Sequence, residues 1–68
     1  MPIPLDRGEL LAQLARREMS QREVAEMIGC RPSSFSSWIR GVNPSPDGFR
    51  QRVEDALGLR RGALKNRT

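Results

Sequence analysis

The chain has 68 residues, a single cysteine, no histidine and a formal net charge of +4. A chain of this length forms one domain with a small core, because it buries only about 60 percent of the surface that its unfolded form exposes. One cysteine excludes an intramolecular disulfide, and the lack of histidine removes the commonest base of acid–base catalysis and a common zinc ligand. We therefore expect no enzyme activity, no metal and no cofactor.

The sequence also lacks the features of a membrane or secreted protein. No apolar run approaches the roughly 20 residues that span a bilayer. The first residues, Met-Pro-Ile-Pro-Leu-Asp, lack the basic and apolar regions of a signal peptide. We expect a cytoplasmic protein that does not contact a membrane.

Positive charge is concentrated in the second half of the chain. Residues 1–30 carry four Arg against five acids, a net charge of −1, whereas residues 31–68 carry seven Arg and one Lys against three acids, a net charge of +5. Such asymmetry favours one surface that binds a polyanion such as nucleic acid, although a basic half is also a common way to keep a protein in solution.

The first predicted helix covers roughly residues 6–18. Asp6 has the side chain of an N-cap, and Glu9 follows at the spacing of a capping box. An apolar stripe on this helix would face the core. It consists of Leu10, Leu11, Leu14 and Ala15.

The next two helices follow closely. Ser20 and Glu23 form a capping box before a helix over residues 21–28, which Gly29 ends by adopting the left-handed conformation. Pro32 then opens a helix that runs to Arg40, because proline is well suited to the first helical position. The inward or rim residues of these helices are Val24, Ala25, Ile28, Phe35, Trp38 and Ile39.

A fourth helix is predicted after the loop at residues 42–44. Ser45 is its expected N-cap, and Pro46 and Asp47 suit its first turn. Its apolar stripe is Phe49, Val53, Ala56 and Leu57, and Gly58 ends it. Residues 60–68 form either a short fifth helix broken by Gly62 or a frayed basic tail.

The apolar spacing after Gln21 points to two helices held at a steep angle by a tight turn. Apolar residues follow Gln21 at Val24, Ile28, Cys30, Phe35 and Trp38, with the small residues Ala25 and Gly29 between them. With Met19-Ser20-Gln21, Trp38-Ile39-Arg40-Gly41, Pro44-Ser45 and Ala56-Leu57-Gly58-Leu59, this pattern resembles the lambda repressor/Cro-like (XRE-type) helix-turn-helix family over about residues 6–59. The resemblance implies an all-α, lambda-repressor-like DNA-binding domain of four or five short helices, spanning residues 1–68 with its core at about 6–59.

The same resemblance implies a set of DNA contacts. Gln21 and Arg22, at the start of the second helix, would meet phosphates, and Arg40 and Asn43 would hold the flanking backbone. The major groove would be read by the exposed early face of the third helix. That face consists of Arg31, Pro32, Ser33 and Ser34, with Ser36 and Ser37 one turn later.

This reading face differs from the family pattern, which often places Gln, Asn, Arg or Lys at the first positions. Serine discriminates bases less sharply than a bidentate amide or guanidinium, which is worth about 1–3 kcal/mol against a wrong base. Arg31 is therefore the best candidate to read a guanine. If Arg31 is a phosphate anchor instead, specificity depends on water, on DNA shape or on contact between Pro32 and a thymine methyl.

Several other residues have simpler interpretations. Cys30 fits a buried structural thiol, and Trp38 fits the core or its rim. The acid pairs Glu23 with Glu26 and Glu54 with Asp55 fit solvated helix faces. Met27 suits either the core or an exposed patch. Leu59 and Leu64 are candidates for a dimer seam, by analogy with the last helix of such repressors.

The sequence thus predicts a sequence-specific double-stranded DNA-binding regulator, a small homodimeric repressor of phage or mobile-element type. It would read an inverted-repeat operator and block polymerase by occupying a promoter. One alternative is the antitoxin of a toxin–antitoxin pair, which would autoregulate its promoter and bind a protein partner. Another is a protein-interaction module on the same scaffold.

Overall fold

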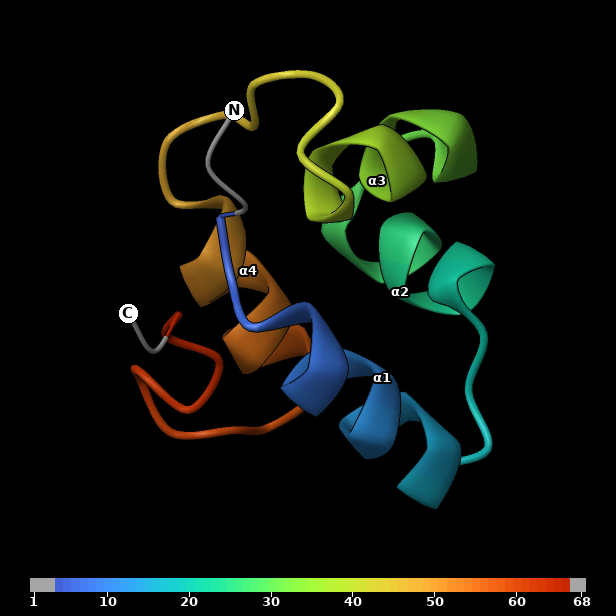
Figure 1. Cartoon of the computed structure of the whole chain (residues 1–68). Helices are drawn as coiled ribbons and strands as arrows, with labels where there is room; N and C mark the ends of the chain where they lie inside the picture. The colour runs from blue at the N-terminus through green and yellow to red at the C-terminus, as the bar shows by residue number, and fades with distance from the viewer. Residues whose placement is uncertain (1–3, 67–68) are drawn as a thin grey trace.

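The computed structural model describes residues 4–66, and within this range the chain forms four α-helices and no β-strand (Figure 1). They are α1 (Arg7–Arg16), α2 (Gln21–Ile28), α3 (Pro32–Ile39) and α4 (Phe49–Ala56). The all-α class that the sequence predicts is confirmed. None of these helices is long or apolar enough to cross a membrane.

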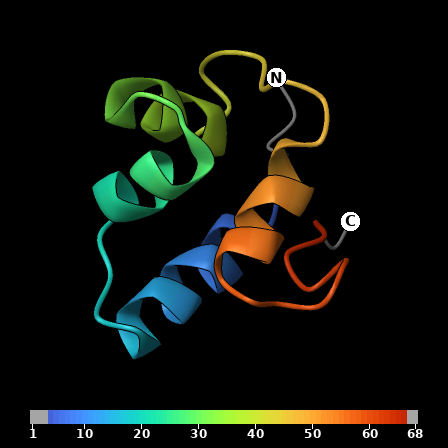
Figure 2. The ribbon, with the colours of Figure 1, turned by 180° about the vertical axis from the view of Figure 1, so that it is seen from behind.

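The helices lie in two neighbouring groups. Figures 1 and 2 show α2 and α3 together on one side and α1 and α4 on the other. α2 packs against both α3 and α4, and so joins the two groups. The chain after α4 lies beside α4 on the side away from α3, which leaves α3 at an outer edge of the molecule.

Local signals set the start of α1. The carboxylate of Asp6 accepts a hydrogen bond from the amide of Glu9 at 3.1 Å, which confirms the predicted cap. The reciprocal half of the capping box is not made, because the Asp6 amide donates instead to the carbonyl of Leu64 at 2.8 Å. Glu9 accepts from the side chain of Gln13.

The apolar stripe of α1 is narrower than predicted. Leu10 and Leu14 are buried, but Leu11 is 37% exposed and Ala15 is exposed, so the expectation for these two residues is wrong. The buried leucines of α1 are the pair at i and i+4, and Leu5, which precedes the helix, is also fully buried.

α2 follows its sequence signals closely. Ser20 and Glu23 form the complete capping box, in which each side chain bonds the other residue's amide. Val24 and Ala25 are buried. Gly29 ends the helix with a φ of 80°, a conformation that costs glycine little and other residues more.

An aromatic cluster fastens α3 to α4. The ring of Phe49, the first residue of α4, lies edge-on to Phe35 and to Trp38, with centroid distances of 5.5 and 5.2 Å. Phe35 and Ile39 are buried and Trp38 is partly buried, as the spacing predicts. The orientation of α3 therefore depends on where α4 begins.

α4 begins later than the sequence predicts. Its N-cap is Gly48, which has a φ of 78° and offers no side-chain cap, and the expected cap Ser45 lies outside the helix. The amide of Phe49 donates to the carbonyl of Pro46 at 3.2 Å, so residues 46–49 form a turn of their own. The left-handed Gly48 separates that turn from the helix.

The sequence predicts either a fifth helix or a frayed tail after α4. As far as residue 66, the structure shows neither. Glu54, on α4, is 1% exposed and accepts hydrogen bonds from the amides of Gly62 (3.0 Å) and Leu64 (2.9 Å). The prediction that Glu54 lies on a solvated face is therefore wrong. We call residues 60–65 the C-terminal turn; residues 67 and 68 of the predicted tail lie outside the described residues.

The C-terminal turn completes the core. Leu64 is fully buried, and the remaining core side chains are Leu5, Leu10, Leu14, Val24, Ala25, Phe35, Ile39, Phe49, Val53 and Leu57. Because the Leu64 side chain is enclosed by its own chain, it has no exposed surface to offer a second copy. Its assignment to a dimer seam is corrected on this ground, and Leu59 is partly buried against the same core.

Candidate nucleic-acid interface

The start of α3 presents three exposed residues. Arg31 is the N-cap of the helix, Pro32 is its first residue and Ser33 follows, and all three are exposed. The Arg31 side chain makes no hydrogen bond or ion pair within residues 4–66. Its guanidinium is therefore free to bind a group outside the chain.

Four serines occupy the sides of α3 that turn away from the core. Ser34, Ser36 and Ser37 are partly buried, and none of the serine hydroxyls from Ser33 to Ser37 makes a hydrogen bond within the described part of the chain. Serine in a helix often bonds the carbonyl one turn earlier. Here the four hydroxyls keep their full hydrogen-bonding capacity for an external partner.

The far end of α3 carries Arg40. Its Nε donates to the carbonyl of Ser36 at 3.3 Å, which folds the exposed side chain back along the helix. Ser33, Ser37 and Arg40 follow at i, i+4 and i+7 and so share one side of the helix. Asn43 is exposed in the loop that leads away from α3.

Arg31 and Arg40 flank the serines at a spacing that can be calculated. Nine residues at a rise of 1.5 Å and 3.6 residues per turn place the two positions about 13.5 Å apart along the helix axis and about half a turn apart around it. Comparison of the chain with protein-family models, with curated proteins and with solved structures finds no match.

α2 contributes a less basic surface than the sequence suggests. Gln21 is partly buried at the first position of the helix. Arg22 is exposed, but its Nε lies 3.4 Å from the Glu26 carboxylate. With Glu23 nearby, the outer face of α2 carries one positive and two negative charges. An exposed pair of this kind contributes only about 0.2–1 kcal/mol, so Arg22 can exchange Glu26 for a phosphate.

The positive charge of the second half does not gather on one face. Arg50 is partly buried, and its Nε lies 3.3 Å from the Glu54 carboxylate. Arg60, Arg61 and Lys65 are exposed on the C-terminal turn, which lies across α4 from α3 (Figures 1 and 2). A ligand on α3 would therefore meet Arg31 and Arg40 rather than the basic C-terminal residues.

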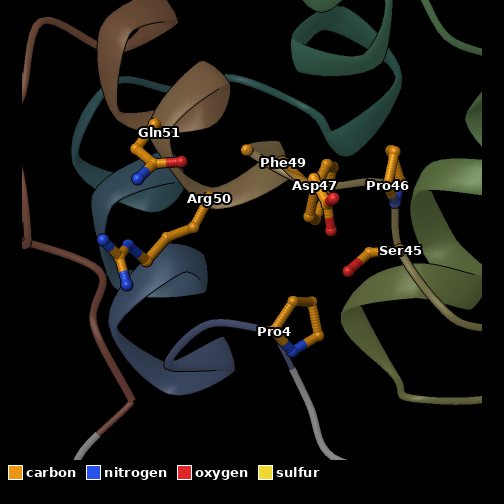
Figure 3. A pocket seen from close by; sticks show the side chains of 8 residues that line it. Pro4, Ser45, Pro46, Asp47, Phe49, Arg50 and Gln51 are labelled. Carbon is orange, nitrogen blue, oxygen red and sulfur yellow. The ribbon is translucent and has the colours of Figure 1, made fainter.

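A shallow pocket of about 250 Å³ lies at the start of α4 and does not have the chemistry of an anion or metal site. Figure 3 shows Ser45, Asp47 and Pro4 around it, with the guanidinium of Arg50 directed away from Ser45 and Asp47. Among residues 4–66, no group of three or more His, Cys, Asp or Glu side chains is placed to hold a metal ion.

Cys30, which the sequence predicts to be buried, is partly buried against the core. Desolvation raises the pKa of its thiol, and the charge of Arg52 opposes that rise. In the sequence, the cation next to Cys30 is Arg31. No local signal identifies Arg52, because it lies on α4, far from Cys30 in sequence, and is brought near only by the packing of α2 on α4.

Proposed function

We propose that this chain is a double-stranded DNA-binding protein of the lambda repressor/Cro-like type, in which α2 and α3 form the helix-turn-helix. One observation carries the proposal: α3 buries Phe35 and Ile39 and carries four serines with unpaired hydroxyls, one exposed and three partly buried, between Arg31 and Arg40. Arg31 and Arg40 border the serines at the two ends of α3. An α-helix is about 10–12 Å across, so it fits the major groove of B-DNA, which is roughly 12 Å wide.

In this proposal, each exposed residue has a distinct role. Arg31 reads a guanine through two hydrogen bonds, and Ser33 and Ser37 bond base edges deeper in the groove. Arg40 and Asn43 hold the phosphates that border the groove, because they lie at and beyond the end of α3. Gln21 and Arg22 hold a phosphate at the start of α2, assisted by the positive end of the helix dipole.

We further propose that the protein is a small cytoplasmic repressor that binds an inverted-repeat operator as a homodimer. The described chain consists of one small domain, so occupancy of a promoter is the simplest mode of action that it can support. Two-fold symmetric proteins bind half-sites about one helical turn apart. The expected operator is therefore a palindrome with that spacing.

The test is selection of bound sequences from a random duplex pool, followed by affinity measurements on the selected duplex by fluorescence anisotropy. We expect a palindromic sequence, and log K that falls with log salt at a slope of about −0.9 for each phosphate neutralised. Failure to enrich any sequence, together with a flat salt dependence, would contradict the proposal and favour a protein-interaction role.

Arg31→Ala examines the reading role directly. If Arg31 contacts a base, the substitution costs about 1–3 kcal/mol on the selected duplex and relaxes the preference at one position. The matched control is Arg16→Ala, because Arg16 is exposed in the last turn of α1, away from α3. An equal loss of affinity on every sequence would assign Arg31 to the backbone instead.

A further inference from the structure

α2 and α4 leave a groove between them on the surface of the molecule. The groove, called the α2–α4 groove below, has a volume of about 380 Å³ and is lined by Met27, Ile28, Arg52, Asp55 and Ala56. Met27, which the sequence left between core and surface, is 54% exposed there. A flexible thioether at such a site adapts readily to a partner surface.

The groove also carries two exposed charges of opposite sign. Arg52 and Asp55 are exposed and lie three residues apart on α4, so they are neighbours on the same side of the helix. Neither makes an ion pair or a side-chain hydrogen bond within residues 4–66. By contrast, Arg22 and Arg50 each have a carboxylate partner.

One cation, one anion and an exposed methionine make this groove complementary to itself. A two-fold interface is isologous, so that residue i of one copy meets residue j of the other and j meets i. Two α4 helices that pack antiparallel would place Arg52 opposite Asp55 of the second copy, twice, with the Met27 side chains between the copies. We infer that a second copy of this chain binds in the α2–α4 groove.

Other occupants fit the groove less well. A nucleic acid would meet the carboxylate of Asp55 and the apolar Met27. A protein surface of a single sign would be repelled by either Arg52 or Asp55. None of the residues that line the groove belongs to α3. The inference rests on the proposed function only in expecting a dimer, and it replaces the Leu59 and Leu64 seam.

The test is sedimentation equilibrium of the full chain without DNA, over a range of concentrations at physiological salt. Four samples are compared with the native protein: Arg52→Asp, Asp55→Arg, an equimolar mixture of these two, and the control Arg61→Asp. The control carries the same change of charge on the exposed C-terminal turn. Circular dichroism confirms that each variant is folded, which is expected because the substituted side chains are exposed.

We expect a reversible dimer for the native chain and for the control. Each single variant should raise the dimer Kd at least tenfold, because both symmetric ion pairs become like-charge contacts. The mixture should recover dimers, since an acid at position 52 then faces an arginine at position 55. That recovery separates pairing between copies from a general loss of stability.

Three results would overturn the inference. A native chain that stays monomeric up to millimolar concentration excludes self-association through this groove. Single variants that dimerise like the control place the contact elsewhere. Monomeric single variants that do not recover on mixing refute the reciprocal Arg52–Asp55 contact. Because these measurements contain no DNA, a dimer that fails to select a duplex refutes the proposed function alone.

Discussion

Glu54 holds the C-terminal turn in place, and Glu54→Ala should therefore destabilise the whole domain. Its carboxylate, 1% exposed, accepts the amides of Gly62 at 3.0 Å and Leu64 at 2.9 Å. The carbonyl of Leu64 in turn accepts the amide of Asp6, the N-cap of α1. One side chain thus connects α4, the C-terminal turn and the start of α1.

The expected size of the effect is worked from the two amides that lose their acceptor; Arg50, whose Nε lies 3.3 Å from the same carboxylate, loses its ion-pair partner as well. A buried N–H left without a partner costs about 1–3 kcal/mol. Because the turn can relax and admit water, we expect the lower half of the sum, about 2–4 kcal/mol for the two groups. A domain of 68 residues is stable by roughly 3–10 kcal/mol at about 0.05–0.15 kcal/mol per residue. The substitution should therefore remove a large part of the stability.

Thermal unfolding followed by circular dichroism gives the measurement. At about 4–8 °C per kcal/mol for a domain of this size, Tm should fall by roughly 10–30 °C. Asp55→Ala is the matched control, because Asp55 is the next residue on α4 but is exposed and has no partner among the described residues. Low micromolar protein keeps self-association out of this comparison.

Amide exchange by NMR provides a second readout at the site. The Gly62 and Leu64 amides should be protected in the native chain and exchange faster in Glu54→Ala. A variant that melts within about 2 °C of the control and keeps slow exchange at both amides would refute the reasoning, because about 2 kcal/mol corresponds to at least 8 °C.

Three further predictions use paired substitutions or pH. Ser20→Ala should cost about 1 kcal/mol by removing a helix cap, whereas Ser45→Ala should change stability by less than about 0.5 kcal/mol in urea unfolding. Gly29→Ala should destabilise by about 1–2 kcal/mol, whereas Gly8→Ala, inside α1, should stabilise. Desolvation raises the pKa of the Cys30 thiol in the folded chain, so the unfolded chain loses this proton first as pH rises. The free energy of unfolding should therefore fall above about pH 9. Cys30→Ala should remove that fall.

α2 could be predicted from the sequence in full because all its signals are local. The capping box needs only Ser20 and Glu23, three residues apart, and Gly29 ends the helix through its own φ. Val24 and Ala25 face inward by helical spacing alone. No contact with a distant segment is needed, so the sequence from Ser20 to Gly29 is sufficient to predict α2.

The errors arise where a distant segment decides the outcome. Glu54 has the sequence context of a solvated acid and becomes buried because the C-terminal turn folds over it. Leu64 looks like an exposed seam residue and enters the core for the same reason. At Ser45, two competing local signals were present, and the left-handed Gly48 prevailed over the serine–proline start.

The sequence predicts which residues lie on the surface of α3, but it does not predict the charges around them. Helical spacing places the serines of α3 on the surface. It does not show that Arg22 lies beside Glu26, or that the C-terminal arginines lie across α4 from α3. Those facts leave Arg31 and Arg40 as the exposed arginines at the ends of α3, so under the proposed function α3 would depend on few strong contacts.

The serines of α3 and the α2–α4 groove are related through the specificity that DNA binding would need. Specific binding usually exceeds non-specific binding by about 4–10 kcal/mol. Under the proposed function, one α3 with Arg31 and single hydroxyl contacts would gain about 1 kcal/mol at each of roughly three bases, near the low end of the cost of a mismatch. A single copy therefore falls short, whereas two copies on a palindrome together reach about 6 kcal/mol. In the proposed function, a weakly discriminating α3 would therefore need a second copy, and the surface proposed to bind that copy is the one that carries Met27, Arg52 and Asp55.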